Sequence, residues 1–330
     1  MSYKSVVVTA RGGTEVLKIV ENELREPLPG EARIRILAAP VCQDDIEVRI
    51  GNRPFLEKPP FIPGYSFVGE VESLGQGVTE VAAGDRVAAL TNFGSYAEYI
   101  YWQADQLIQV PKVLVPAEAV VLILNYLVAI QTMHRVVQVK AGDTVLIIGA
   151  SGGVGTAYLQ LGKLAELKMY GLASASKHST LLEYGAIPID YHTQDFVEVI
   201  SDAEPDGLDY VFNGMGEEYF ERGLAVLRRG GVMVHYGAPR SFGRFLLLAG
   251  KLILYNLLPN GKSIKGYGTH RGKIEPFKED WRTLFQLLEE GKIKPMIVAK
   301  YPILDAAKAN DLLESGQVTG NLVLVSPELL

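Results

Sequence analysis

The sequence has very little cysteine and no excess of basic residues. Cys42 is the single cysteine among 330 residues, which excludes an internal disulfide bond and any zinc lobe built on four cysteines. The chain carries 32 basic and 38 acidic side chains, and its net charge of −6 argues against a nucleic acid-binding surface. These absences favour a reducing, cytoplasmic setting and leave room for no more than a local basic pocket.

Signals for secretion and for membrane spanning are also missing. The first residues lead directly into a strand-like run at 5–10, without the apolar core or cleavage site of a signal peptide, so we expect no secretion. The most lipid-like segment, 245–258, is shorter than the ~20 residues that span a bilayer and carries Lys251 near its centre. We expect it to form a buried helix, a dimer edge or a wall of the substrate pocket rather than a membrane span.

Length and composition indicate two domains. Apolar residues make up 48% and charged residues 21%, the balance of an ordinary globular protein. A single core rarely grows past ~250–300 residues, so 330 residues favour two cores. Up to about residue 110 the chain is rich in glycine and proline and indicates a compact, mostly β domain. Its short strand-like runs lie at 32–39, 66–74, 86–90 and 96–102.

From about residue 117 the pattern changes to alternating strands and helices. An apolar helical stretch at 117–137 leads into six strand-like runs, the number in a doubly wound dinucleotide-binding sheet. The six runs lie at 145–148, 168–173, 187–190, 208–213, 231–237 and 263–267. We expect the remaining elements to return to the first domain. They are a helix near 281–290, a strand at 299–302, a helix at 304–314 and a strand at 321–325.

The most informative motif is Gly149-Ala150-Ser151-Gly152-Gly153-Val154-Gly155. It follows the first apolar strand of the series and opens an apolar helix, which is the context that a dinucleotide fingerprint requires. Glycines allow the tight turn and the close approach of the backbone to a pyrophosphate, whose charge the helix start stabilises. The predicted cofactor contacts in this turn are Ser151, Gly152, Gly153 and Val154.

The end of the second strand favours NADPH over NADH. An NAD site normally has Asp or Glu about 20 residues past the glycines, yet no carboxylate occurs here between Glu166 and Glu183. Small hydroxyls and a cation in that place would hold a 2′-phosphate. The predicted phosphate contacts are Ser174, Lys177, the adjacent cation His178, and Tyr191 just past the third strand. The alternative is that Lys177 and His178 simply start a solvated helix.

Three further residues are predicted near the cofactor because they follow the fourth and fifth strands. Asn213 and Gly214 end the fourth strand, and Gly237 ends the fifth. Ligands of open α/β sheets bind at the carboxyl edge, close to the switch point of the strand order. Either glycine could instead serve only a turn.

The chain resembles the medium-chain dehydrogenases/reductases, and within them the zinc-free, zeta-crystallin-like quinone oxidoreductases. The resemblance covers nearly the whole chain. The matching stretches, in order, are Gly64-Tyr65-Ser66, Gly69-Glu70-Val71, Gly84-Asp85-Arg86-Val87, Gly94-Ser95-Tyr96-Ala97-Glu98-Tyr99, Lys140-Ala141-Gly142-Asp143, 150–155, Ile189-Asp190-Tyr191, 227–231 and Val318-Thr319-Gly320.

The resemblance implies an α/β architecture of two domains. A GroES-like, mostly β catalytic domain would comprise residues 1–124 and 266–330, and a Rossmann domain with a six-stranded parallel sheet would comprise 125–265. It further implies a substrate cleft between the domains and a homodimer, which is usual in the group, while NADP(H) as cofactor is predicted from the residues after the second strand.

The resemblance also argues against a catalytic zinc. Zinc-dependent relatives use a cysteine, a Gly-His-Glu triplet and a further cysteine. Cys42 matches the first ligand position, but Tyr65 and Ser66 stand in place of the histidine and glutamate. A zinc site needs three protein ligands and an open fourth position, so we expect no metal, and Cys42 is expected to line the pocket or the core.

The candidate catalytic residues come from the same resemblance. Tyr65 would face the nicotinamide from the former ligand position, and a packed core tyrosine is the alternative. Asp45 matches an aspartate near the family's substrate cleft, although it could simply cap a helix. Tyr126 matches a stretch that borders the nicotinamide or serves structure alone, and Asn321, next to Val318-Thr319-Gly320, completes the expected cofactor contacts.

These features together predict reduction of an activated acceptor. Without zinc, alcohol oxidation lacks its Lewis acid, whereas a quinone or an α,β-unsaturated carbonyl accepts hydride with a few hydrogen bonds on the developing oxyanion. Cys42, Glu47 and Val128 stand where quinone reductases often have Asn, Tyr and Thr, which leaves the substrate open. The alternatives are an enoyl reductase for a long acyl or polyketide chain and a cofactor-binding protein with a structural or scaffold role.

Overall fold

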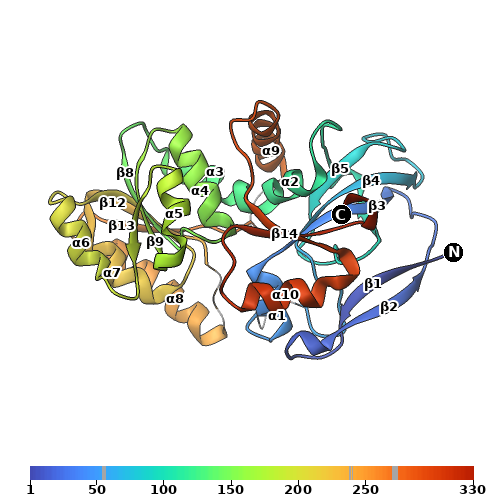
Figure 1. Ribbon diagram of the computed structural model, residues 1–330, viewed down its shortest axis with the longest axis horizontal. Helices are drawn as coiled ribbons and strands as arrows, with labels where there is room; N and C mark the ends of the chain where they lie inside the picture. The colour runs from blue at the N-terminus through green and yellow to red at the C-terminus, as the bar shows by residue number, and fades with distance from the viewer. Residues whose placement is uncertain (54–56, 238, 240, 270–273) are drawn as a thin grey trace. The chain divides into compact units, whose positions relative to one another are not determined.

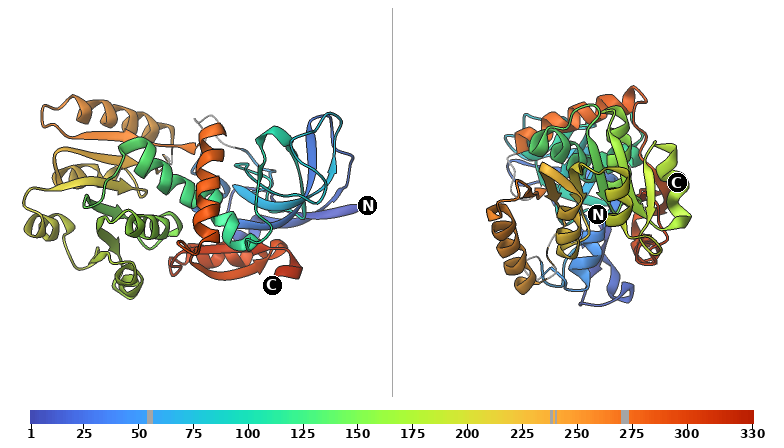
Figure 2. Two further views of the ribbon diagram at one scale, coloured as in Figure 1. Left: turned by 90° about the horizontal axis from the view of Figure 1, so that it is seen from above. Right: turned by 90° about the vertical axis from the view of Figure 1, so that its left-hand side faces the viewer.

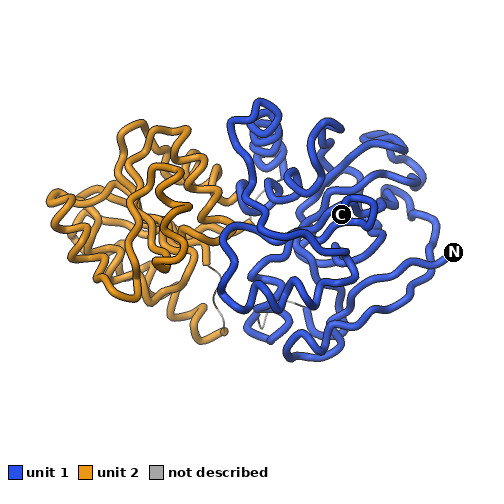
Figure 3. Tube along the Cα trace, viewed as in Figure 1, with its two compact units in different colours: residues 1–127, 273–330 blue, residues 128–272 orange. Residues whose placement is uncertain are grey.

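The computed structural model of the protein describes residues 1–53, 57–237, 239, 241–269 and 274–330. The chain divides into two compact units (Figure 3). Unit 1 contains Met1–Leu127 and Lys273–Leu330, and unit 2 contains Val128–Gly272. The first and last parts of the chain therefore build one unit, and the middle builds the other.

Unit 2 is built around a six-stranded parallel sheet. Its strand order is β10-β9-β8-β11-β12-β13, the classic order of a doubly wound dinucleotide fold. The strands are β8 (Thr144–Ile148), β9 (Lys168–Ala173), β10 (Ile187–Asp190), β11 (Leu208–Asn213), β12 (Leu227–His235) and β13 (Ser263–Gly266). The sequence prediction of six strands is confirmed, although β12 begins at Leu227 rather than at residue 231.

Helices cover both faces of this sheet (Figure 1). One face carries α4 (Gly153–Leu164) and α5 (His178–Glu183), and the other carries α6 (Phe196–Ala203), α7 (Phe220–Ala225) and α8 (Phe242–Leu257). On the second face Phe196, Phe220 and Leu224 pack on the sheet in one buried cluster. Because all six strands are parallel, their carboxyl ends lie at the same edge of the sheet.

Of the three alternatives predicted for 245–258, a buried helix, a dimer edge or a pocket wall, the structure excludes the buried helix. The segment is helical within α8, but none of the helix's residues is buried. Leu248, Leu252 and Tyr255 pack partly against the core, while the opposite face is exposed. Figure 2 shows α8 on the outside of unit 2, where only one of its faces has a sheet to pack against.

Unit 1 contains a two-stranded and a seven-stranded sheet. The small sheet pairs β1 (Ser2–Val8) with β2 (Leu17–Glu23). The large sheet has the order β14-β15-β3-β4-β5-β7, with β6 also paired to β3. Its strands are β3 (Glu31–Val41), β4 (Ser66–Leu74), β5 (Arg86–Leu90), β6 (Tyr99–Gln103), β7 (Ile108–Gln109), β14 (Ile297–Pro302) and β15 (Asn321–Val325).

The last elements return to the first part of the chain, as the sequence predicts. Strand β15 pairs antiparallel with β3, placing Leu322 opposite Val41. The helices of this unit are α1 (Gln43–Arg49), α2 (Pro116–Val121), α9 (Ile274–Glu289) and α10 (Ala306–Glu314). The strand at 299–302 and the helix at 304–314 thus exist with slightly shifted starts.

One helix among the described residues is long and apolar enough to span a membrane. It covers Pro116–Val137, and 78% of its apolar window is buried inside the protein. It includes α2, α3 (Leu127–Ile130) and two π-helical stretches. A buried core helix passes the same test of length and composition, so this helix is weak evidence for a membrane span.

Candidate functional site

The glycine turn leads into the accessible start of α4. Gly149 has a φ of +83°, which a side chain rarely adopts, and its carbonyl accepts a hydrogen bond of 3.2 Å from the Gly152 N–H. Gly152 is the N-cap residue, and no side chain caps the helix. The first-turn N–H groups of an α-helix have no partner within the helix, so this turn offers donors to a phosphate.

The glycines of this turn have different tasks. A Cβ on Gly155 would lie 2.2 Å from the Gly149 carbonyl oxygen, so helix and turn can approach only because this residue is glycine. A Cβ on Gly152 would meet its nearest atom at 3.6 Å, an ordinary contact. Gly152 is exposed and Ser151, Gly153 and Val154 are partly exposed. Gly155 therefore serves packing, while the exposed residues 151–154 remain open to a ligand.

The polar residues after β9 lie beside the glycine turn. Strands β8 and β9 pair with Ile148 opposite Leu172, and the Ala150 N–H donates to the Leu172 carbonyl at 3.1 Å. Ser174 follows β9 directly, and its hydroxyl lies 3.3 Å from that of Ser176. This arrangement places hydroxyl groups next to the glycine turn.

A lysine and a histidine follow the same strand. Partial burial lowers the pKa of the Lys177 ammonium, because desolvation disfavours the charged form. His178 begins α5, and its Nε2 lies 3.2 Å from the Ala173 carbonyl oxygen. Lys177 directly precedes α5, so both side chains lie at the carboxyl end of β9.

The third strand ends at Asp190, whose carboxylate already accepts hydrogen bonds, and the exposed Tyr191 follows it. Tyr191 is 49% exposed and lies against the His192 ring with centroids 4.2 Å apart. The Asp190 carboxylate accepts from the His192 N–H at 3.1 Å and from the Thr193 hydroxyl at 3.0 Å. The carboxylate is thus used within its own loop, and the Tyr191 ring is accessible.

Asn213 organises the loop after β11 with its own side chain. Its Nδ2 donates to the Gly216 carbonyl at 2.7 Å, and its Oδ1 accepts from the Met215 N–H at 2.9 Å. A Cβ on Gly214 would lie 2.5 Å from the Tyr236 ring, and one on Gly237 would lie 2.9 Å from the Gly214 carbonyl oxygen. These glycines allow the loops after β11 and β12 to pack against each other at the carboxyl edge.

In unit 1, Asp45 is the centre of a buried hydrogen-bonded cluster. Its carboxylate accepts from the N–H of Cys42 at 3.0 Å, the N–H of Gly64 at 2.9 Å and the hydroxyl of Tyr96 at 3.0 Å. Burial raises the pKa of Asp45 to about 7, against the opposing effect of these hydrogen bonds. The reach back to the N-cap residue of α1 is that of a capping box.

Cys42 and Tyr65 lie in the same part of unit 1 and are both buried. Burial raises the pKa of the Cys42 thiol well above its usual value, and the nearby Asp45 charge adds to this. Burial likewise raises the pKa of the Tyr65 phenol. Both groups therefore stay protonated near neutral pH. The phenol can donate a hydrogen bond, whereas a protonated thiol is a poor nucleophile.

The remaining predicted residues, Tyr126 and Asn321, also belong to unit 1. Tyr126 is fully buried in the long helix. Asn321 begins β15, accepts from Asn125 Nδ2 at 2.6 Å and donates to the Met296 carbonyl at 3.0 Å. The structure thus joins Asn321 to Asn125, the neighbour of Tyr126 in the sequence.

The sequence reasoning missed the role of Tyr96. Its stretch, Gly94 to Tyr99, contributes to the family resemblance, but nothing in the sequence pattern connects Tyr96 to Asp45, 51 residues earlier. Among the described residues no group of three His, Cys, Asp or Glu side chains could hold a metal ion. The ligand set of a zinc site is therefore not found around Cys42.

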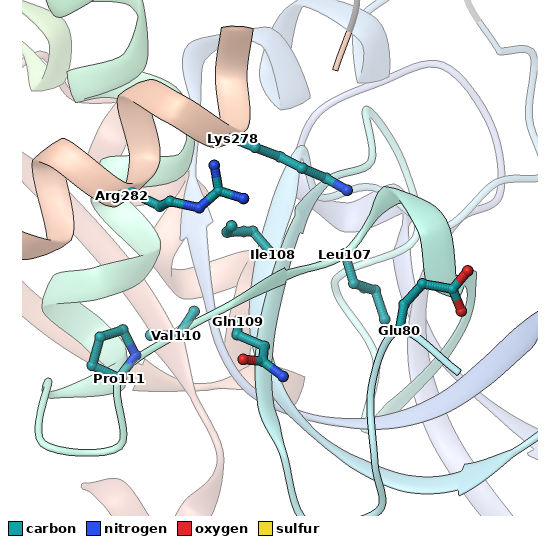
Figure 4. Close-up of a pocket in the computed structure, with 8 residues that line it drawn as sticks. All are labelled: Glu80, Leu107, Ile108, Gln109, Val110, Pro111, Lys278 and Arg282. Carbon is teal, nitrogen blue, oxygen red and sulfur yellow. The ribbon is translucent and has the colours of Figure 1, made fainter. Parts of the chain in front are cut away.

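A cavity of ≈ 530 Å³ in unit 1 lies apart from these residues (Figure 4). It is lined by Glu80, residues 107–111, Lys278 and Arg282. Figure 4 shows Lys278 and Arg282 extending from α9 above β7. None of the sequence-predicted site residues lines it, so it is not part of the candidate site.

Two family models match the chain. The model described as alcohol dehydrogenase GroES-like domain matches residues 28–112, and the one described as zinc-binding dehydrogenase matches residues 185–324. The first match lies in unit 1, and the second covers the later strands of unit 2 and the return to unit 1.

Individual proteins match over almost the full chain. The rat synaptic vesicle membrane protein VAT-1 homolog is 30% identical over 98% of this chain and 84% of its own length. The pig quinone oxidoreductase is 28% identical over 95% of each chain. The crystal structure of the Escherichia coli quinone oxidoreductase complexed with NADPH superposes with a TM-score of 0.87, at 26% identity, over 98% of this chain and 99% of that one.

Proposed function

Because this chain belongs to the medium-chain dehydrogenase/reductase superfamily, in its zinc-free quinone oxidoreductase group, we propose that it is an NADPH-dependent reductase. The hydride acceptor would be a quinone or an α,β-unsaturated carbonyl compound, and no metal would take part. The observation that carries this proposal is the polar end of β9 beside the glycine turn. Ser174 and Lys177 occupy the position where an NAD enzyme has a carboxylate.

Residues of unit 2 would hold the cofactor. The accessible turn at residues 151–154, with the N–H groups of the first turn of α4, would bind the pyrophosphate. Ser174, Lys177, His178 and Tyr191 would bind the 2′-phosphate, and NADPH would be favoured over NADH because no ribose-binding acid stands there. Asn213 would act as a positioning residue, because its amide already holds the loop that carries Gly214.

Residues of unit 1 would serve the acceptor. NADPH supplies the hydride when bound. The neutral Tyr65 phenol would donate a hydrogen bond to the acceptor oxygen on which negative charge develops, and solvent would supply the proton. Asp45 would position Gly64, the residue before Tyr65, through its N–H. Cys42 would line the site as a protonated thiol, and Tyr126 and Asn321 would contact the cofactor.

The first test is a cofactor and acceptor panel on chelator-treated protein. Oxidation of NADPH and of NADH is measured with a naphthoquinone, an alkenal and a long-chain enoyl thioester, and alcohol oxidation is measured with NADP⁺. We expect NADPH-preferring reduction of the quinone or the alkenal, no alcohol oxidation and no effect of the chelator.

Other outcomes of this panel would replace the proposal. Turnover confined to the enoyl thioester would identify an enoyl reductase for a long acyl chain. NADPH binding without turnover of any acceptor would indicate a structural or scaffold role. Sedimentation of the same protein tests the homodimer, and fractionation of the expressing cells tests the cytoplasmic location.

A further inference from the structure

The cavity of unit 1 that α9 and β7 line has a positively charged wall. Lys278 and Arg282 of α9 form this wall, and Glu80 and residues 107–111 line the rest of the cavity (Figure 4). The volume of ≈ 530 Å³ lies within the range of about 300–1,000 Å³ that is usual for small-molecule sites. This cavity, here called the α9 cavity, therefore has the size of a small organic ligand.

The packing of α9 fixes both positive side chains at the cavity. Phe277 and Trp281 are buried, and the Trp281 indole N–H donates to the Ile123 carbonyl at 3.1 Å. Lys278 and Arg282 are four residues apart, so they lie on one side of the helix, next to its buried face. Figure 4 shows both side chains extending from α9 over β7. Rotation of the helix would break the buried contacts, so the two charges are held side by side.

Neither of these charges has an ion-pair partner among the described residues. The Lys278 ammonium donates to the Asp105 backbone carbonyl at 2.6 Å, which uses one of its three donors. The Arg282 guanidinium forms no hydrogen bond within the part of the chain that the structure describes. A guanidinium offers five N–H donors in a planar fork that matches a carboxylate. Most donors of this wall are therefore available to an anion.

The other walls restrict the kind of anion. Four of the five residues at 107–111 are apolar, so they offer a surface on which an apolar ligand body can pack. Glu80 is exposed, and its carboxylate accepts from the Thr79 N–H at 2.9 Å. A carboxylate in the wall repels further negative charge. A monoanion with an apolar body therefore fits the α9 cavity better than a polyphosphate or a polycarboxylate.

We infer that the α9 cavity binds a small organic monocarboxylate. The Arg282 guanidinium holds the carboxylate through two parallel hydrogen bonds, and the Lys278 ammonium adds a further charge-assisted one. The apolar part of the ligand lies against residues 107–111. The inference stands on unit 1 and does not depend on the proposed reductase activity, because none of the residues assigned to that activity lines the cavity.

The test is titration of the full chain at low ionic strength with three probes. Benzoate carries a carboxylate on an apolar ring, benzamide has the same shape without the charge, and inorganic phosphate has charge without an apolar body. Ligand-observed proton and phosphorus NMR measure the bound fractions. We expect benzoate to bind with a Kd of about 1 mM and the other two probes to bind at least tenfold more weakly. Benzoate binding should weaken as NaCl is added.

Three variants assign the binding to this cavity. Lys278→Gln with Arg282→Gln removes both positive charges and should weaken benzoate binding at least tenfold. Lys18→Gln with Lys300→Gln is the matched control, because it changes the net charge equally at two exposed positions of unit 1 outside the cavity, and it should bind benzoate like the wild type. Glu80→Gln removes the repelling carboxylate and should tighten phosphate binding about threefold.

Several results would overturn the inference. Benzoate binding that is equal in the wild type and in the Lys278→Gln, Arg282→Gln variant would show that the α9 cavity is not the site. The absence of benzoate binding by the wild type at about 20 mM would have the same consequence. Phosphate binding as tight as that of benzoate would identify a phosphate site instead. Displacement of benzoate by NADPH would place benzoate in the proposed cofactor site.

Discussion

The carboxyl edge of the sheet in unit 2 and the Asp45 cluster in unit 1 are built in opposite ways. At the sheet edge Gly152 and Tyr191 are exposed, and helix α4 starts without a side-chain cap. In the cluster, Asp45 and Tyr96 are buried and bonded to each other. An open edge with spare donors suits the binding of a charged ligand, whereas a closed cluster fixes the backbone around it.

This difference separates residues that bind a ligand from residues that hold the protein backbone in place. The edge residues act on whatever reaches them from solvent, so their substitution should alter binding. The cluster residues act on Gly64 and Tyr65, so their substitution should alter stability or turnover. The predictions below test this division.

The largest effect should come from the packing glycine of the turn. Gly155→Ala places a methyl group 2.2 Å from the Gly149 carbonyl oxygen and should lower the free energy of unfolding by about 3 kcal/mol, with loss of NADPH binding. Thermal unfolding and cofactor titration measure the two effects. Gly152→Ala, with its nearest atom at 3.6 Å, should keep the melting temperature and lose affinity only. Equal melting temperatures for both variants would contradict the assignment.

The next largest effect should be on turnover. Tyr65→Phe removes the phenolic donor and should lower kcat by about 100-fold with little change in the Kd for NADPH, because the hydrogen bond strengthens only as charge develops. Steady-state kinetics and cofactor titration measure this. Tyr99→Phe, whose hydroxyl donates to Glu72 on β4, is the control. An unchanged kcat would mean that Tyr65 only packs in the core and does not stabilise the developing charge.

A smaller and more selective effect should follow at the cofactor edge. Lys177→Ala should raise the KM for NADPH by about 30-fold and leave that for NADH nearly constant, because it removes a charge-assisted contact to the phosphate. Lys168→Ala is the matched control at the opposite end of β9, where the ammonium pairs with Glu204. Equal losses for both cofactors would show that Lys177 does not contact the phosphate.

The smallest effect should be a pH dependence from Asp45. Its folded-state pKa is raised to about 7 from 3.8, so the folded protein holds a proton there that the unfolded chain has released. Stability from this group therefore falls as pH rises through that window, by at most about 1.4 kcal/mol between pH 5 and pH 6.

Denaturant unfolding of the wild type and of Asp45→Asn at both pH values isolates this term, because other groups cancel in the difference. The variant should lack this part of the fall in unfolding free energy between pH 5 and pH 6. The same slope in both proteins would mean that Asp45 is already ionised in the folded state at pH 5.

The secondary structure of unit 2 follows closely from local pattern. Strands β9, β10 and β11 occur at the predicted residues, because apolar runs bounded by turn residues are a local signal. For the segment of helix α8 the sequence left a buried helix, a dimer edge and a pocket wall as alternatives, and the structure excludes the first. The composition of α8 resembles that of a core helix, and burial depends on what packs against each face, which a single segment does not encode.

Only part of the candidate site can likewise be predicted from local sequence pattern. The glycine turn and the polar residues after β9 are recognisable from spacing, since helix start, turn and strand end are contiguous in the chain. Tyr65 and Asp45 were found only through the resemblance to a family, and no spacing rule connects Asp45 to its partners Gly64 and Tyr96.

The sequence by itself determined the alternation of strands and helices, the dinucleotide turn and the lack of an acid after β9, because each depends on neighbouring residues. Only the tertiary structure decided that Asp45 holds Gly64 and that α8 leaves an apolar face exposed. Hydrogen-bond partners and burial depend on which distant segments meet, and that is settled when the whole chain packs.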